Sequence, residues 1–227
     1  RAIGDADEAL VLNPRDFLAL TTRAQARLAR HEIDGAMADV EQSLTINARY
    51  APSYVIRAQA RLDQRDFPRA VADFTAALRL EPRSIDVLAQ RAVAYQLQAD
   101  FPHALADIEE ILKLEPQSAL GLRLRGDLHE AKGQFAGALA DYDEAIRIDP
   151  QNAITYYSRA WIHFRAARYE LARADYDACL ALQPGNVDYL NARGDTRAKL
   201  ADYEGAIADY SAVLEIDPNN TWAIVHR

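Results

Sequence analysis

Apolar residues along this chain recur at the three- and four-residue spacings that predict amphipathic helices. Ala138, Tyr142, Ala145 and Ile148 form one such run, and residues at these spacings share one face of an α-helix. Polar turn signals, such as the Lys-Gly-Gln segment at 132–134, separate consecutive runs. The pattern therefore predicts an all-α protein built from short helices.

A fixed interval of 34 residues organises these helices, and a period of this length indicates stacked structural repeats. The interval is marked by Pro14, Ala48, Pro82, Pro116, Pro150, Pro184 and Pro218. Cutting the chain two residues after each mark gives six full units and two partial ones. The full units span 17–50, 51–84, 85–118, 119–152, 153–186 and 187–220, and the partial units span 1–16 and 221–227.

Each unit keeps small and bulky residues at set positions, which we number as columns from the first residue of the unit. Column eight is always Ala or Gly and column twenty is always Ala, so two helix backbones can approach closely there. Pro68 and Pro102 fall where a second helix would begin, a position that tolerates a missing N–H. The proline at column thirty-two ends that helix because the residue before it is disfavoured in the α region. Each unit should contain two helices.

The combination of a small residue at column eight, Ala at twenty, an aromatic at twenty-four and Pro at thirty-two resembles the tetratricopeptide repeat family. The resemblance covers essentially the whole chain, although column seven holds Arg where the family has Leu, and column four holds Leu or Tyr where it has Trp. It implies a right-handed superhelical solenoid of antiparallel helix pairs, forming a single domain over residues 1–227, in which each pair is stabilised by its neighbours. It also implies that first helices line a concave face, where the family mostly binds peptides or proteins.

Two charged columns do not vary. Arg at column seven and Asp at column twenty-three can meet as a bidentate pair on antiparallel helices, and Asp39 is placed equally well for Arg23 and Arg57. One hypothesis is an arginine row that grips an acidic ligand. We favour an ion-pair ladder that repeats because the fold repeats, since a binding site rarely needs seven identical residues. The columns hold Arg23, Arg57, Arg91, Arg125, Arg159, Arg193 and Arg227, and Asp39, Asp73, Asp107, Asp141, Asp175 and Asp209.

The columns that vary are those that the resemblance places on the concave face. Tyr157, Trp161 and Phe164 stand out there, because sibling units place small, polar or modest aliphatic residues at these columns. Aromatic residues and Arg are enriched where binding energy concentrates, which favours a groove anchor at Trp161 over simple packing against the next second helix. The expected peptide-binding residues are Arg123, Asp127, Glu130, Tyr157, Trp161, Phe164, Arg165, Asn191, Asp195 and Lys199.

Charge narrows the class of partner. A net charge of −8 opposes non-specific binding to nucleic acid or to an anionic membrane, and acidic residues around the aromatic trio favour a basic or mixed-charge ligand. Apolar runs fall short of the ~20 residues that span a bilayer, so no direct membrane insertion is expected. Some members of the family bind a terminal carboxylate with Lys, Asn and Arg at columns two and six. These columns lack those residues here, which disfavours a co-chaperone that binds the tail of a chaperone.

No catalytic residue, cofactor or metal site is predicted. The histidines lack zinc-ligand spacing, and the column that His129 and His163 share usually packs between helices. Cys179 falls at a column for small buried residues, so we expect an inert core thiol. A single cysteine excludes an internal disulfide. It does not distinguish a cytoplasmic protein from a periplasmic one whose signal has been removed.

The chain begins inside a predicted second helix and stops inside a first one, so we expect an excerpt from a longer array. Its Ala- and Arg-rich composition indicates a GC-rich bacterial genome. The predicted function is a non-enzymatic scaffold that binds a peptide or protein segment in its concave groove. Two alternatives stay open: the scaffold arm of a larger enzyme, and a structural array in which apolar ends associate end to end.

Overall fold

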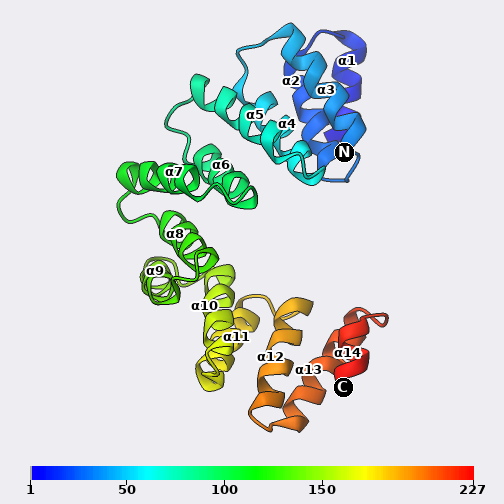
Figure 1. The fold of residues 1–227 in the computed structure, drawn as a ribbon. Coiled ribbons are helices and arrows are strands. Elements are labelled where there is room, and N and C mark those ends of the chain that lie inside the picture. The colour runs from blue at the N-terminus through cyan, green and yellow to red at the C-terminus, as the bar shows by residue number, and fades with distance from the viewer. Residues whose placement is uncertain (1) are drawn as a thin grey trace. The chain divides into compact units, whose positions relative to one another are not determined.

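The computed structural model describes residues 2–227, and all regular secondary structure in that range is helical, as the sequence predicts (Figure 1). Even-numbered helices are the first helices of the repeats and odd-numbered helices are the second. The helices are α1 (Ala2–Leu12), α2 (Phe17–Leu28), α3 (Ile33–Ile46), α4 (Ala51–Asp63), α5 (Phe67–Leu80), α6 (Ile85–Leu97), α7 (Phe101–Leu114), α8 (Ala119–Ala131), α9 (Phe135–Ile148), α10 (Ala153–Arg165), α11 (Tyr169–Leu182), α12 (Val187–Lys199), α13 (Tyr203–Ile216) and α14 (Thr221–His226).

Helix boundaries follow the 34-residue register without a slip. Every first helix from α2 onward begins at column one, and every second helix from α3 onward runs from column seventeen to column thirty. Several starts are capped locally, since Asp66, Asp100 and Asp202 each accept a backbone N–H from the first turn that follows. These caps satisfy donors that a helix start otherwise leaves free.

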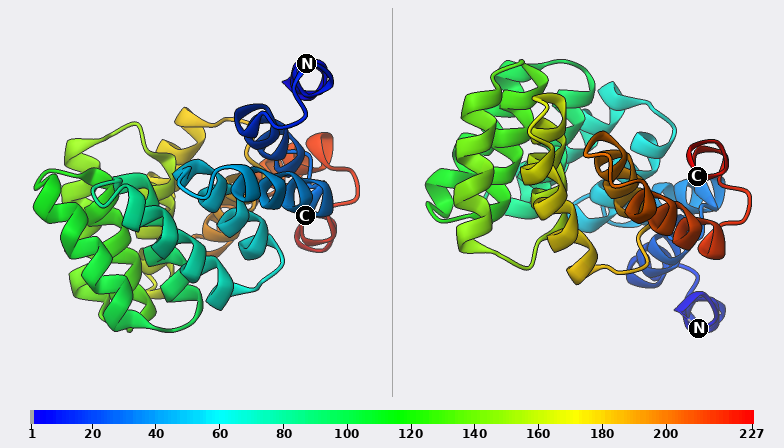
Figure 2. Two further views of the ribbon diagram at one scale, coloured as in Figure 1. Left: turned by 90° about the horizontal axis from the view of Figure 1, so that it is seen from above. Right: turned by 90° about the horizontal axis from the view of Figure 1, so that it is seen from below.

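The chain divides into two compact units, one ending at Pro116 and the other spanning Gln117–Arg227. In the first unit the helix pairs are α2–α3, α4–α5 and α6–α7, with α1 packed on α2. In the second unit the pairs are α8–α9, α10–α11 and α12–α13, with α14 packed on α13. Within each unit, every helix thus packs against the next along the chain, as the ribbons of Figure 2 show.

The small columns lie where paired helices approach most closely. Ala24 and Ala36, at columns eight and twenty of the first repeat, are both fully buried, and their counterparts in the later repeats are buried as well. Column twenty-four supplies the largest buried side chains, which are Phe74, Tyr142, Tyr176 and Tyr210. Small residues therefore allow the approach, and the column-twenty-four side chain, aromatic in four repeats and Val40 or Ile108 in the other two, fills the space beside it.

The residue before the marker position leaves the helical region in every repeat. Glu115, which precedes Pro116, has φ −134° and ψ 90°, as expected from the restriction that proline imposes. Asn47 has φ −137° and ψ 90° although Ala48 follows it. Packing of the next first helix therefore maintains this bend even where proline is absent.

Column fifteen adopts the left-handed conformation in every full repeat. Gly133 has φ 72°, which glycine adopts readily, whereas the other repeats place larger residues there at φ 56° to 60°. These are His31, Arg65, Ala99, Ala167 and Ala201. The turn is closed by backbone bonds, such as the one from Arg168 N–H to His163 C=O at 2.9 Å, so tertiary packing holds a conformation that the local residue disfavours.

The ion-pair ladder predicted from columns seven and twenty-three is present in all six full repeats, and each pair lies within one repeat. Arg159 donates from Nε and Nη2 to the two oxygens of Asp175 at 2.9 and 2.6 Å. The six aspartates are only 3 to 6% exposed, and the bond to Asp175 raises the pKa of Arg159 above its usual value. The ambiguity of Asp39 is thereby resolved, because it pairs with Arg23.

The third donor of the same arginine joins neighbouring repeats through column twenty-five. Arg159 Nη1 lies 2.6 Å from Asp143 Oδ1, and Arg193 Nη1 lies 2.8 Å from Asp177 Oδ1, each acid belonging to the preceding repeat. A second arginine sits at column eleven in some repeats, as where Arg197 Nη1 lies 2.9 Å from Asp209 Oδ2. The ladder therefore ties each helix pair together, and at Arg23, Arg159 and Arg193 it also reaches the repeat before.

We expect Arg159→Ala to lower the free energy of unfolding more than Arg193→Ala does. Removing Arg159 leaves the buried Asp175 without a charged hydrogen-bond donor, which costs about 3 kcal/mol. Asp209 keeps Arg197 when Arg193 is removed, so that loss is about half as large. Denaturant unfolding followed by circular dichroism measures both. Arg147→Ala, which breaks an exposed pair with Glu144, is the control and should leave the midpoint unchanged; equal losses for Arg159 and Arg193 would refute the ranking.

A second prediction concerns the left-handed turns. Ala167→Gly and Ala201→Gly should each stabilise the protein by up to about 1 kcal/mol, because relief of the left-handed strain exceeds the added entropy of the unfolded glycine. Gly133→Ala should destabilise it by a similar amount. Ala166→Gly is the matched control, since its φ is −85° and no strain is relieved. Stabilisation by Ala166→Gly as well would show that the turn conformation is not the cause.

Candidate functional site

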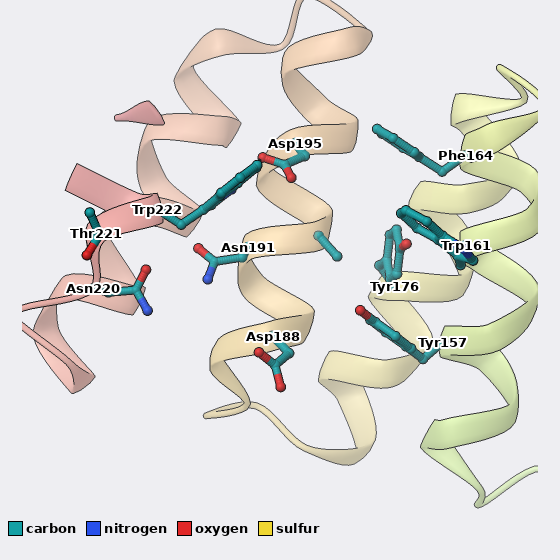
Figure 3. Close-up of a pocket in the computed structure, with 11 residues that line it drawn as sticks. Tyr157, Trp161, Phe164, Tyr176, Asp188, Asn191, Asp195, Asn220, Thr221 and Trp222 are labelled. Atoms are coloured by element: carbon teal, nitrogen blue, oxygen red, sulfur yellow. The ribbon is translucent and has the colours of Figure 1, made fainter. Parts of the chain in front are cut away.

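A pocket of ≈ 480 Å³ opens on the first helices of the second unit (Figure 3). It is built mainly from α10 and α12, with residues at the start of α14 completing one side. Its lining residues are Tyr157, Trp161, Phe164, Tyr176, Asp188, Asn191, Ala192, Asp195, Asn220, Thr221 and Trp222.

The aromatic wall comes from α10, where columns five, nine and twelve share one face. Trp161 is 43% exposed and stacks against Phe164 with ring centroids 6.2 Å apart and planes 9° apart. Tyr157 lies deeper and packs against Tyr176 at 5.8 Å and Tyr189 at 5.3 Å. The three side chains therefore have different environments: Tyr157 contributes to the core, and Trp161 presents a large apolar face to solvent.

The polar wall comes from α12, where Asp188, Asn191 and Asp195 follow one another at spacings of three and four. Asn186 caps this helix by accepting bonds from the N–H groups of Asp188 and Tyr189. The three side chains are drawn along the same stretch of α12 in Figure 3. The pocket thus combines aromatic surface on one helix with hydrogen-bond acceptors on the next.

Asp195 is held in place by two donors from other helices. The Tyr210 hydroxyl donates to Oδ1 at 2.6 Å, and Trp222 Nε1–H donates to the same oxygen at 3.1 Å. Burial is the main reason that the pKa of Tyr210 is raised, so this hydroxyl stays protonated and remains a donor. Asp195 is therefore oriented before any ligand arrives.

Glycine at column eight makes that arrangement possible. A Cβ built on Gly194 would lie 2.8 Å from Tyr210 Cε1, which is too close for two carbon atoms. In the fourth repeat Gly126 faces Tyr142 in the same way, and the Tyr142 hydroxyl donates to Asp127 Oδ1 at 2.7 Å. Gly at column eight, Asp at nine and Tyr at twenty-four therefore act together in two repeats.

The acidic cluster of the fourth repeat is partly neutralised within the chain. Arg123 Nη1 lies 2.6 Å from Asp127 Oδ2, and the Tyr142 hydroxyl also reaches Glu130 Oε2 at 3.2 Å. Burial raises the pKa of both Asp127 and Glu130, and the charge of Arg123 opposes that rise at Asp127. Asp127 is therefore ion-paired within the chain, and Glu130 accepts a bond from a neutral hydroxyl.

Models of known protein families match much of this sequence. A model described as TPR repeat matches residues 126–166, and one described as tetratricopeptide repeat matches residues 57–96 and 157–221. Together they match more than half of the chain. The chain belongs to the tetratricopeptide repeat (TPR) family. Comparison with curated protein sequences finds no significant match.

Solved TPR structures share the fold at low sequence identity. A tetratricopeptide repeat protein from Parabacteroides merdae superposes with a TM-score of 0.80 and 17% identity, over 99% of this chain and 89% of that one. The APC/C hetero-tetramer Cut9-Hcn1 also gives 0.80, at 15% identity over 97% of this chain, which spans 44% of the Cut9-Hcn1 chain. YrrB, a TPR protein with an unusual peptide-binding site, gives 0.54 at 17% identity over 82% of this chain and 96% of that one.

Half of the residues expected at the site line the pocket, and the others lie elsewhere in this TPR unit. Arg165 lies over the Phe135 ring at 5.1 Å, in a separate pocket near the turn between α10 and α11. Lys199 is exposed at the last position of α12. The pocket residues among those expected are Tyr157, Trp161, Phe164, Asn191 and Asp195, whereas Arg123, Asp127 and Glu130 form the acidic cluster of the fourth repeat.

Sequence reasoning missed Trp222, Tyr176 and Asp188 as lining residues. Trp222 belongs to the short α14, which the repeat pattern covers only in part, and its indole donates to Asp195 across repeats. The recurring Gly-Asp dipeptide at columns eight and nine, together with Tyr at column twenty-four, was the sequence pattern that could have indicated the Tyr–Asp hydrogen bond. In the fifth repeat these columns hold Ala160, Trp161 and Tyr176 instead, and Tyr176 lines the pocket.

Other reactive groups do not form a second site. Cys179 lies in the core, as expected, and burial raises the pKa of its thiol to about 12. His163 and His129 lie beside the buried aspartates of their own repeats, and His129 Nε2 is 3.6 Å from Asp141 Oδ2. Across residues 2–227, no group of three or more His, Cys, Asp or Glu side chains is placed to hold a metal ion. Within that same range, every helix is too short or too polar to cross a membrane.

We expect Gly194→Ala to destabilise the second unit by about 2 kcal/mol, because the new methyl group overlaps the Tyr210 ring. Denaturant unfolding measures the loss. In a Tyr210→Val background the further loss caused by Gly194→Ala should be much smaller, since the first repeat places Val40 opposite Ala24 at the same two columns. Full stability in Gly194→Ala alone would contradict the proposed steric role of this glycine.

Proposed function

We propose that this TPR protein is a non-enzymatic scaffold that binds a peptide or protein segment in the pocket between α10, α12 and α14. The observation that supports this most directly is the exposure of Trp161 in an open pocket. Aromatic side chains with one free face are the residues around which protein-binding energy concentrates.

The fold does not require a large aromatic residue at this position. Column nine holds Gln25, Gln59, Val93, Asp127 and Asp195 in the sibling repeats. Their helices all begin at column one, as α10 does, and only α2 ends one residue earlier. Trp161 is therefore an addition to the repeat framework, which supports a role in recognition.

Two of the structural relatives support this class of function. YrrB is described as having a peptide-binding site, and Cut9-Hcn1 is a hetero-tetramer. TPR proteins commonly mediate protein–protein interactions, and the pocket offers aromatic faces and acceptors to a peptide. A solvent-open surface of this kind suits recognition better than catalysis, which gains from excluding water.

Trp161→Ala should weaken binding to a peptide selected on the wild-type protein. We expect a loss of about 2 kcal/mol, or roughly thirtyfold in Kd. Peptides from a displayed library of random linear sequences provide the probe, and isothermal titration measures Kd. Leu171→Ala is the control, because Leu171 is 52% exposed on a second helix away from the pocket. If the selected peptides bind the Trp161 variant as tightly as wild type, this pocket is not the binding site.

A further inference from the structure

We propose that the pocket recognises an arginine side chain of the partner, which occupies at Asp195 the place that Arg123 occupies at Asp127. This inference rests on the proposed peptide-binding function and specifies the residue that the pocket selects. It follows from a comparison of two repeats of the same chain.

The fourth repeat shows a complete arrangement of donors around the column-nine carboxylate. The Tyr142 hydroxyl bonds Oδ1 of Asp127 at 2.7 Å, and Arg123, at column five, bonds Oδ2 at 2.6 Å. A buried or partly buried carboxylate is stable as an anion when both oxygens have such donors.

The sixth repeat has the same arrangement with one donor missing. Tyr210 and Trp222 both bond Oδ1 of Asp195, and among the described residues no donor bonds Oδ2. Column five is Asn191 in this repeat, so the chain does not supply the arginine that the fourth repeat has. A partner can supply it from the open side of the pocket.

The remaining polar groups of the pocket favour a cation with several N–H donors. Asp188 and Asp195 are the only charged residues that line it, so the pocket is negative. Asn191 Oδ1 is shielded from solvent and lacks a hydrogen-bond partner within the described structure. A guanidinium group has five donors in a planar fork and can satisfy several acceptors at once, whereas an ammonium group is a compact point charge.

The aromatic wall adds a second preference for arginine. The flat guanidinium stacks on aromatic faces, and its attraction is strongest for tryptophan. Trp161 and Phe164 present a nearly parallel pair of rings in the same pocket as the carboxylates. The negative field extends to this wall, since Asp188 and Asp195 contribute, after burial, to the raised pKa of Tyr157.

A pocket on the first helices of the first unit lacks this combination. The pocket in the first unit, between α4 and α6, carries carboxylates at Glu81 and Asp86 but no aromatic lining residue. Its amides are partly paired with each other, since Gln59 Nε2 donates to Gln90 Oε1 at 2.7 Å. The pocket beside Trp161 joins unneutralised carboxylates to aromatic faces.

The test begins with selection of random twelve-residue peptides on the full chain, followed by synthesis of the tightest binder and of versions with arginine replaced. We expect selected peptides to share an arginine whose replacement by citrulline, which keeps the shape and removes the charge, weakens binding about tenfold or more. Replacement by lysine should cost less. Binding should weaken with added salt, because charge attraction contributes to it.

Four protein variants locate the effect. Asp195→Asn should lower affinity for the arginine peptide about tenfold and leave affinity for the citrulline peptide unchanged. Asn191→Arg should supply the missing donor from within the chain and abolish the preference for arginine over citrulline. Asn191→Met, of similar length without charge, removes one acceptor and should reduce that preference without abolishing it. Glu170→Gln, an equal change of charge on α11, is the control and should keep the preference in full. Circular dichroism confirms that each variant is folded.

The outcomes separate this inference from the proposed function. Peptides that need Trp161 but contain no shared arginine, or that bind Asp195→Asn and wild type alike, would overturn the arginine inference and leave the peptide-binding function intact. If no peptide is enriched on wild type over the Trp161→Ala variant, both fail. An arginine preference that Asn191→Arg removes and Asn191→Met only reduces would establish the assignment.

Discussion

A carboxylate is buried in every full repeat, and it must find cationic partners to remain charged there. The column-twenty-three aspartates are nearly inaccessible to water, so each needs the two donors that the column-seven arginine provides in a single planar group. That pairing sets how the second helix sits against the first. The third donor reaches the previous repeat in several places. The same ion pair therefore maintains both the hairpin and its stacking.

Because the framework is concentrated in a few columns, the rest of each first helix is free to vary. Trp161, Asp127 and Asp195 all occupy column nine without changing the helix boundaries. What differs is the chemistry presented to solvent: one repeat neutralises its own carboxylate through Arg123, and another leaves one oxygen of Asp195 available. A repeated scaffold thus carries local surfaces of different charge and polarity, and recognition arises from these departures from the repeat.

The interactions that sequence analysis identified well are those that recur. Six copies of Arg and Asp in register indicate a pair, and six small residues at column eight indicate a close approach. Residues that occur in one repeat alone were harder to place from the sequence. Arg165 was expected beside Trp161, yet it lies over Phe135, since its position at the end of α10 directs it toward the neighbouring repeat. The contribution of Trp222 depends on a bond to Asp195 that spans 27 positions of sequence.

By itself, the sequence determined the helix register, the repeat boundaries and the partner types of the ladder, because periodic hydrophobicity and turn residues act locally and every repeat supplies independent evidence for them. The tertiary structure decided which arginine each aspartate takes, which oxygens stay unpaired, and that Asn47 and Ala167 adopt conformations that their own residue types do not require. These outcomes depend on contacts between residues far apart in sequence, and such contacts exist only once the helices have packed.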